Sequence, residues 1–150
     1  RQLIIDLEHR DMVLEAKLEQ TGLNELSGYR HSKAWAEKQL VYFHIQFEAP
    51  IKKLTYDSSG RKAAVQFDEG DELLVKVAIS AVDEGGAKKN METEISHWDF
   101  DKVRTESRQV WADKMRKIEV EGGSEDQMTV FYTALYHTMI APNINPGLSL

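Results

Sequence analysis

Hydrophobic residues alternate with polar ones in the first half of the chain and follow a helical period in the second half. Residues 40–47 are the clearest case, because Val41, Phe43, Ile45 and Phe47 alternate with more polar side chains. A period of two predicts a β-strand that places one face on a core and the other toward solvent. The same pattern predicts strands at residues 3–7, 13–20, 25–29, 51–56, 63–67 and 72–80.

Turn signals separate these expected strands. Asp57, two serines and Gly60 lie between the strands at 51–56 and 63–67, and small polar residues with a glycine favour a hairpin turn. Several short strands with turns between them indicate an antiparallel sandwich and not alternating strands and helices. We read residues 30–38 as a polar loop that precedes the strand at 40–47.

The period becomes helical from about residue 84. Gly85 and Gly86 predict a turn, followed by a short helix at residues 87–94. Asp99 is a candidate N-cap for a longer helix. The apolar stripe expected on that helix consists of Phe100, Val103, Val110, Trp111, Met115 and Ile118.

A last helix is expected to begin after Ser124, where Ser124 and Gln127 have the spacing of a capping box. One face carries large apolar residues from Met128 to Ile140. The opposite face, which includes Val130 and His137, is also nearly uncharged. A helix that is apolar or weakly polar all round is normally buried on both sides. Pro142 then ends the helix.

Composition narrows the possible partners. The formal net charge is −6, and no cluster of Lys and Arg alternates with aromatic residues, so nucleic acid and anionic membranes are not expected partners. The chain has no cysteine, which excludes disulfides, thiolate metal sites and a cysteine nucleophile. No apolar run approaches the length of a membrane span. Because the chain opens with Arg1 and Gln2 in a strand-like segment, we expect it to be part of a longer protein.

Four stretches resemble family 92 of the glycoside hydrolases. They are LIIDLEHRD (residues 3–11), SGYRHSKAWAEKQLVYFHIQF (27–47), DELLVKVAIS (71–80) and the run from ISHWDFDKVR through KIEVEGGSEDQMTVFYTALYHTMIAPN (95–143). The resemblance covers nearly the whole chain in order, and its last run is the most specific. After Asn143 the sequence departs from the family pattern. Residues 144–150 occupy the place where the family usually has a segment with an Asp-Val-Asp-Gly-like motif.

The resemblance implies an exo-acting α-mannosidase, often specific for α-1,2 linkages, that removes terminal mannose from N-glycans or mannans. It implies inversion of configuration, a requirement for calcium, and a secreted or periplasmic location. The implied architecture is an N-terminal β-sandwich, a helical linker and an (α/α)6 barrel. The implied divisions of this chain are residues 1–82 for the end of the β-sandwich, 83–123 for the linker and 124–150 for the start of the catalytic domain.

The resemblance places the catalytic chemistry elsewhere. An inverting glycosidase needs one carboxylic acid to protonate the leaving oxygen and one carboxylate to activate water. In the family both belong to motifs that this chain does not contain, and the calcium ligands also belong to that later region. We therefore expect no catalytic residue and no metal ligand here. The five histidines are spread along the chain without a ligand pair.

Five residues are candidates for mannose contact. Trp35 could stack on a sugar face or close the end of the sandwich, and its neighbours Arg30 and His31 could donate hydrogen bonds or be ordinary surface residues. His137 could point into a barrel funnel or be a buried, hydrogen-bonded histidine. Asn143 could line the pocket or cap the helix.

An alternative function remains open: a non-catalytic carbohydrate-binding or structural β-sandwich module with a helical tail. The last helix separates the two hypotheses, because an independent module has no use for a helix that is apolar on both faces. The expected partners are mannose-containing glycans and the rest of the parent chain.

Overall fold

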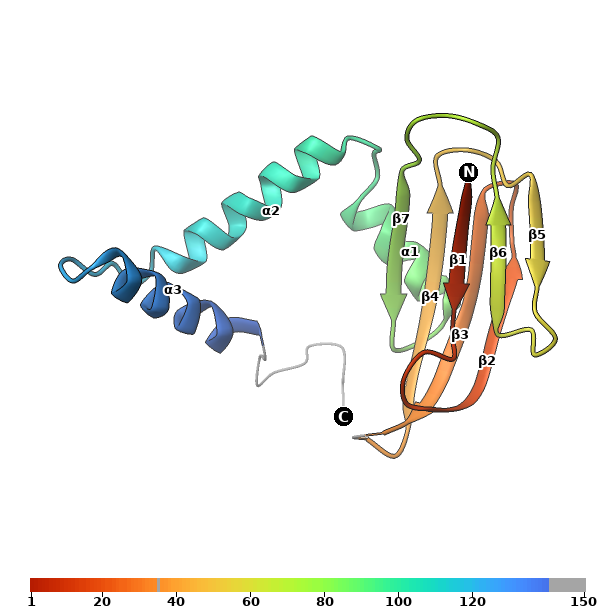
Figure 1. Ribbon diagram of the computed structural model, residues 1–150, viewed down its shortest axis with the longest axis horizontal. Helices are drawn as coiled ribbons and strands as arrows, with labels where there is room; N and C mark the ends of the chain where they lie inside the picture. Colours follow the sequence, from red (N-terminus) through yellow and green to blue (C-terminus); the bar gives the residue numbers. More distant parts are fainter. Residues whose placement is uncertain (35, 141–150) are drawn as a thin grey trace. The chain divides into compact units, whose positions relative to one another are not determined.

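The computed structural model describes residues 1–34 and 36–140, and these residues fall into two compact units. The first unit, Arg1–Trp98, contains the described β-strands and helix α1. The second unit begins at Asp99 and contains helices α2 and α3. Figure 1 follows the chain from the strands into the helices.

Two antiparallel sheets form the first unit. One has the order β1-β6-β5, with β1 at Gln2–Asp6, β6 at Lys62–Gln66 and β5 at Lys53–Tyr56. The other has the order β2-β3-β4-β7, with β2 at Met12–Gln20, β3 at Glu25–Lys33, β4 at Gln39–Phe47 and β7 at Val75–Ser80. We call these the three-stranded and the four-stranded sheet.

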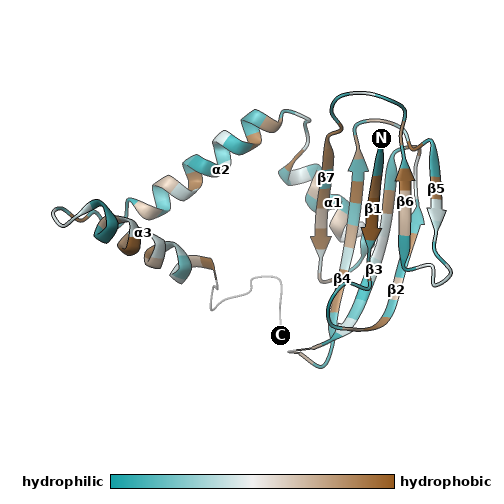
Figure 2. Cartoon of the chain, in the orientation of Figure 1, coloured by the Kyte–Doolittle hydropathy of each residue, from teal (hydrophilic) through white to brown (hydrophobic). Residues whose placement is uncertain are grey.

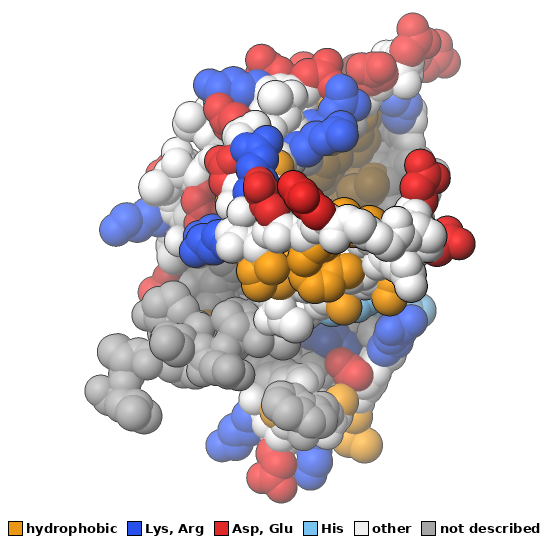
Figure 3. Space-filling view, turned by 90° about the vertical axis from the view of Figure 1, so that its left-hand side faces the viewer, with side chains coloured by type: hydrophobic (Ala, Val, Ile, Leu, Met, Phe, Trp, Pro, Cys, Tyr) orange, Lys and Arg blue, Asp and Glu red, His pale blue; other side chains and the backbone are white. Residues whose placement is uncertain are grey.

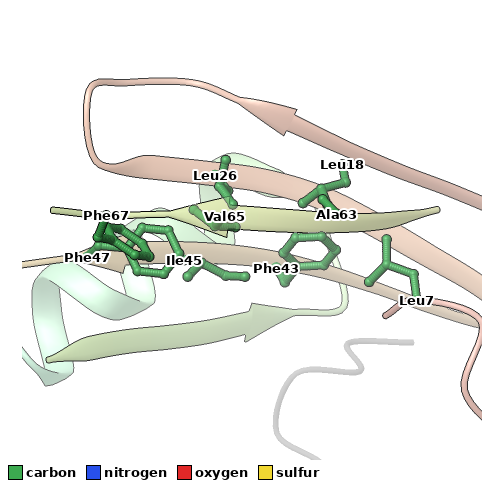
Figure 4. Packing of buried hydrophobic residues seen from close by; sticks show 9 residues of the cluster. All are labelled: Leu7, Leu18, Leu26, Phe43, Ile45, Phe47, Ala63, Val65 and Phe67. Carbon is green, nitrogen blue, oxygen red and sulfur yellow. The ribbon is translucent and has the colours of Figure 1, made fainter. Parts of the chain in front are cut away.

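The core lies between the two sheets. Alternate side chains of each strand point to this inner face, so Phe43, Ile45 and Phe47 of β4 meet Val65 of β6 and Phe67, which follows it. The rings of Phe47 and Phe67 lie 4.8 Å apart. Figure 4 shows the cluster, whose remaining members are Leu7, Leu18, Leu26 and Ala63. The prediction that the odd-numbered residues of this strand face the core is thus confirmed for Phe43, Ile45 and Phe47.

Helix α1, Glu84–Glu94, covers part of the outer face of the four-stranded sheet. Asp83 caps its first turn by accepting a hydrogen bond from the backbone of Gly86. Ala87 and Met91 are its buried residues. Gly86 lies against β7, because a Cβ atom at this position would stand 2.7 Å from Ser80 Oγ.

The second unit consists of helices α2, Phe100–Met115, and α3, Glu125–Ile140, joined by a turn with positive φ at Gly122 and Gly123. Neither helix contains a buried residue within the described chain. Val130 is 68% exposed and Ile140 is 52% exposed. Figure 2 shows hydrophobic residues along α3, and Figure 3 shows hydrophobic side chains gathered among charged ones.

The predicted fold class, a partial antiparallel β-sandwich followed by helices, is confirmed. Both predicted helix caps are also confirmed. Asp99 accepts a hydrogen bond from the Lys102 backbone at 2.9 Å. Ser124 and Gln127 exchange the two bonds of a capping box, at 2.9 and 3.3 Å. The assignment of α3 to an (α/α)6 barrel and the three domain divisions stay predictions.

Element boundaries differ from the sequence prediction most clearly at β3, α1 and β7. Strand β3 continues to Lys33, into the segment that we expected to be a loop, because it stays paired with β2 and β4. Helix α1 begins at Glu84 and includes both glycines that predicted a turn, since Asp83 caps it there. Strand β7 begins at Val75 and not at residue 72.

Candidate functional site

Arg30 binds the loop between β1 and β2. It lies on the same face of β3 as the core residue Leu26. Its guanidinium group donates to the carbonyl oxygens of Leu7 (2.9 Å), His9 (3.2 Å) and Arg10 (3.0 Å), to Ser32 Oγ (2.9 Å) and to Asp11 Oδ2 (3.5 Å). A guanidinium group has five N–H donors, so the loop and Ser32 engage all of them. The predicted mannose contact by Arg30 stays a prediction, and the contacts present here hold the loop.

His31 lies on the opposite face of β3 from Arg30, because neighbouring side chains of a strand alternate. It shares that outer face with Tyr29, whose cross-strand neighbour is Tyr42 of β4. The two tyrosine rings lie 5.9 Å apart in an edge-to-face arrangement. Tyr29 donates a hydrogen bond of 2.6 Å to Glu15 of β2, and this bond raises the pKa of the phenol. His31 therefore belongs to a half-buried polar and aromatic face.

The remaining candidates fall elsewhere in the chain. Trp35 and Asn143 lie outside the described residues. His137 belongs to α3 of the second unit, where its side chain is exposed and its ring lies 5.8 Å from that of Tyr136. The structure therefore does not bring these candidates together on one surface within the described residues. Arg30 and His31 are neighbours in the sequence, but their side chains point to opposite faces of β3.

A polar pocket of about 270 Å³ lies between α1 and the outer face of the four-stranded sheet. Glu25 of β3 and His44 of β4 line it from the sheet, and Lys88 lines it from α1. The other lining residues are Gln46, Lys76, Met91, Glu92, Ile95 and Ser96. These residue types could bind a small polar molecule or hold α1 in place.

The groups in this pocket are bound to one another. Lys88 Nζ donates to Glu25 Oε2 at 3.0 Å, and Gln46 Nε2 donates to Oε1 of the same carboxylate at 3.1 Å. His44 is 2% exposed; its Nδ1 lies 2.8 Å from Ser27 Oγ and its Nε2 lies 3.9 Å from Glu25. Lys76, also buried, donates to the Ile95 carbonyl at 3.1 Å and lies 4.1 Å from the Trp98 ring centre. The cluster therefore fastens α1 to the sheet.

Ionisation in the pocket does not favour an acid catalyst. The hydrogen bond from Lys88 lowers the pKa of Glu25. Burial lowers the pKa of His44, and the nearby Glu25 carboxylate opposes that shift in part. A general acid needs a carboxyl group whose pKa is raised toward the working pH. In the described residues the carboxyl groups with a shifted pKa are Asp6, Glu25, Asp57 and Asp68, and in each the pKa is lowered.

The described residues also do not fit a calcium ion. Calcium requires several converging oxygen ligands. Within residues 1–34 and 36–140, no group of three or more His, Asp or Glu side chains lies close enough to hold a metal ion.

The sequence did not predict the Glu25–His44–Lys88 cluster. Its members lie on β3, β4 and α1, and only the strand register and the packing of α1 bring them together. The sequence places His44 on the outer, polar side of the most regular strand, and no signal within that strand distinguishes a buried histidine from an exposed one. A histidine there becomes buried only when a helix covers that face.

Comparisons of the sequence with known proteins show which protein family the chain resembles. The glycosyl hydrolase family 92 catalytic domain matches residues 86–148. An uncharacterized secreted glycosidase of Arthroderma benhamiae is 39% identical over 79 residues, which cover 50% of this chain and 10% of that protein. The chain resembles family 92 of the glycoside hydrolases, as the sequence motifs predicted.

Solved structures extend the match to both units. The family GH92 α-mannosidase BT3965 of Bacteroides thetaiotaomicron is 25% identical, with a TM-score of 0.79, over 91% of this chain and 21% of that chain. The inverting mannosidase BT2199 of the same species has a TM-score of 0.77 at 21% identity over 92% of this chain, which shows the fold alone. This chain spans about one fifth of the length of these mannosidases.

No helix in the described part of the chain is both long and apolar enough to cross a membrane.

Proposed function

We propose that the chain is part of a secreted or periplasmic, calcium-dependent exo-α-mannosidase of glycoside hydrolase family 92. The enzyme would hydrolyse terminal α-1,2-linked mannose from N-glycans or mannans with inversion of configuration. One observation carries the proposal: a single α-mannosidase of this family aligns with 91% of the chain, through both the sandwich and the helices. The secreted relative supports the location.

In this proposal the chain supplies scaffold and part of the mannose pocket. The acid, the base and the calcium ligands are proposed to come from the rest of the parent chain. Two observations support this: the carboxyl groups with a shifted pKa in the described residues have it lowered, and no three or more His, Asp or Glu side chains gather there closely enough to hold a metal ion. Trp35, His31, His137 and Asn143 are proposed mannose contacts. Arg30 is also a proposed mannose contact, and it holds the loop at residues 7–11 in position.

The test uses the natural gene product that contains residues 1–150. It is incubated with α-1,2-mannobiose, released mannose is measured, and proton NMR identifies the first anomer formed. We expect β-mannose to form first, turnover to stop with a chelator, and calcium to restore it. The 150-residue chain alone is the matched control and should release no mannose. Turnover by that chain, or no mannose release by the complete product, would contradict the proposal.

The alternative is a non-catalytic carbohydrate-binding or structural module, which a β-sandwich also suits. Against it stands the helical unit, in which α2 and α3 have no buried residue and large apolar side chains are exposed. Mannobiose binding by the complete product, measured by calorimetry without any hydrolysis, would support this alternative.

A further inference from the structure

Lys76 of β7 is a buried cation without a carboxylate partner. Its side chain lines the pocket between α1 and the four-stranded sheet, and the residue is 8% exposed. The ammonium group donates to the Ile95 carbonyl at 3.1 Å and lies 4.1 Å from the centre of the Trp98 ring. Within the described residues it forms no ion pair. Because a lysine ammonium has three N–H donors, it retains donor capacity for a further partner.

The other charges of the pocket do not neutralise this cation. Glu25, Gln46 and Lys76 form one cross-strand row on β3, β4 and β7. Both oxygens of the Glu25 carboxylate are engaged, one by Lys88 at 3.0 Å and the other by Gln46 at 3.1 Å. Glu92 of α1 is exposed, so solvent screens its charge. The sheet side of the pocket thus holds one neutral ion pair and one unpaired positive charge, which is costly to bury.

His44 is the second buried polar group of this pocket with a free position. Its Nδ1 lies 2.8 Å from Ser27 Oγ, whereas its Nε2 lies 3.9 Å from Glu25 Oε2, which is beyond hydrogen-bond distance. The pocket volume of about 270 Å³ far exceeds the share of one water molecule, about 30 Å³. Met91 and Ile95 add apolar atoms to its lining. The pocket therefore has room for a small molecule with one polar and one apolar end.

We propose that the pocket between α1 and the four-stranded sheet binds a small organic monocarboxylate, which accepts hydrogen bonds from Lys76 and His44. Its hydrocarbon part contacts Met91 and Ile95. When Ser27 donates to Nδ1 of His44, the ring carries its proton on Nε2 and donates it to the bound carboxylate.

The charge of the pocket selects this class of ligand. One negative charge matches the one unpaired ammonium group, and hydrogen bonds between charged groups are the stronger ones. A neutral sugar would leave Lys76 without a counter-charge. Inorganic phosphate would bring more negative charge close to the carboxylates of the pocket and would leave its apolar lining without a partner. The proposal goes beyond the proposed function and stands on this pocket alone.

The experiment measures acetate binding to the complete gene product that contains residues 1–150. Saturation-transfer difference NMR follows the acetate methyl group in a titration, and acetamide serves as the neutral ligand of the same shape. We expect saturable acetate binding, with acetamide at least tenfold weaker because it lacks the charge. The variant Lys76→Met keeps the length of the side chain and should weaken acetate binding about tenfold. The matched control is Lys53→Met, an exposed lysine of β5, which should leave binding unchanged.

A second variant keeps the test decisive if Lys76→Met does not fold, as circular dichroism would show. His44→Gln retains a side chain that can bond to Ser27, and it should weaken acetate binding about threefold. Wild-type affinity in either folded variant, equal binding of acetamide, or no saturable binding overturns the proposal. Phosphate that binds more tightly than acetate also overturns it, because the site then selects charge and not a carboxylate. Mannose release is not measured here, so a failure of the proposed activity leaves this result intact.

Discussion

At the scale of single residues, Arg30 determines the shape of the β1–β2 loop. Arg10 and Asp11 in this loop have φ values of 55° and 50°, a conformation that costs free energy outside glycine. The hydrogen bonds that Arg30 donates to the loop carbonyl groups offset that cost in free energy. Arg30 thus connects a strained loop to the centre of the four-stranded sheet.

We expect Arg30→Met to lower the free energy of unfolding of the first unit by about 2 kcal/mol, because it leaves the partly buried Leu7 carbonyl, and the more exposed carbonyls of His9 and Arg10, without this donor. Urea unfolding followed by tyrosine and tryptophan fluorescence measures the change. The control is Lys33→Met, on the same strand but with an exposed side chain. Equal losses for both variants would show that the guanidinium contacts contribute nothing specific.

We expect the buried side chain of His44 to make the stability of the first unit depend on pH. Burial lowers its pKa below the ordinary value of 6.5, so the unfolded chain binds the proton more readily than the folded chain does. Stability is therefore lost as the pH falls below 6.5. Around it, Glu25 and Glu92 raise the pKa and Lys88 lowers it. The lowered pKa of Glu25 adds a further loss below pH 4.5, because its ionised form is stabilised in the fold.

We expect the free energy of unfolding of the first unit to fall between pH 7.5 and pH 5.5, and to fall less in the variant His44→Gln. Urea unfolding at both pH values provides the comparison, and exposed His9→Gln serves as the control. If both variants keep the wild-type pH dependence, His44 does not control stability in this range.

At the scale of elements, β2 and β3 approach so closely that only glycine fits at position 28. A Cβ atom on Gly28 would lie 1.8 Å from the Lys17 carbonyl oxygen and 2.8 Å from Phe43 Cζ. The added atom would collide with the backbone of β2 and with a core phenylalanine. Moving the backbone would break strand pairing, and moving the phenylalanine would disturb the core.

We expect Gly28→Ala to destabilise the first unit by about 3 kcal/mol or more, at the upper end of overpacking effects. Gly60→Ala is the comparison: its φ is +70° but open space surrounds it, so it should cost only about 1 kcal/mol. Thermal unfolding followed by circular dichroism distinguishes the two. A smaller effect at position 28 than at position 60 would contradict this packing.

Features whose signal lies within one segment could be predicted from the sequence. Features that depend on contacts between segments could not. Alternation located β4, and cap chemistry located the starts of α2 and α3, because both signals lie within one segment. The end of β3 was missed because its inner positions there hold Arg30 and Ser32 in place of apolar residues. The Glu25–His44–Lys88 cluster also could not be predicted, since it depends on the packing of α1.

At the scale of the whole molecule, the two units differ in what stabilises them. The first unit has a core of apolar side chains from both sheets, whereas the described helices of the second have none buried. Hydrophobic burial supplies most of the stability of a fold, and short helices are marginal without it. In the described part of the chain, α2 and α3 contact each other through exposed or half-exposed side chains, among them the rings of Trp111 and Tyr136, whose centres lie 4.7 Å apart.

We therefore expect the 150-residue chain to lose its second unit first. Hydrogen exchange should be slow in β3 and β4 and fast in α2 and α3, and limited proteolysis should cleave after residue 98 and leave residues 1–98 intact. In the complete gene product the same helices should resist both treatments, because further protein would bury their apolar faces. Slow exchange in α2 and α3 of the short chain at low concentration would mean that these helices are stable without such burial. The main physical reason for placing them in a larger helical domain would then be lost.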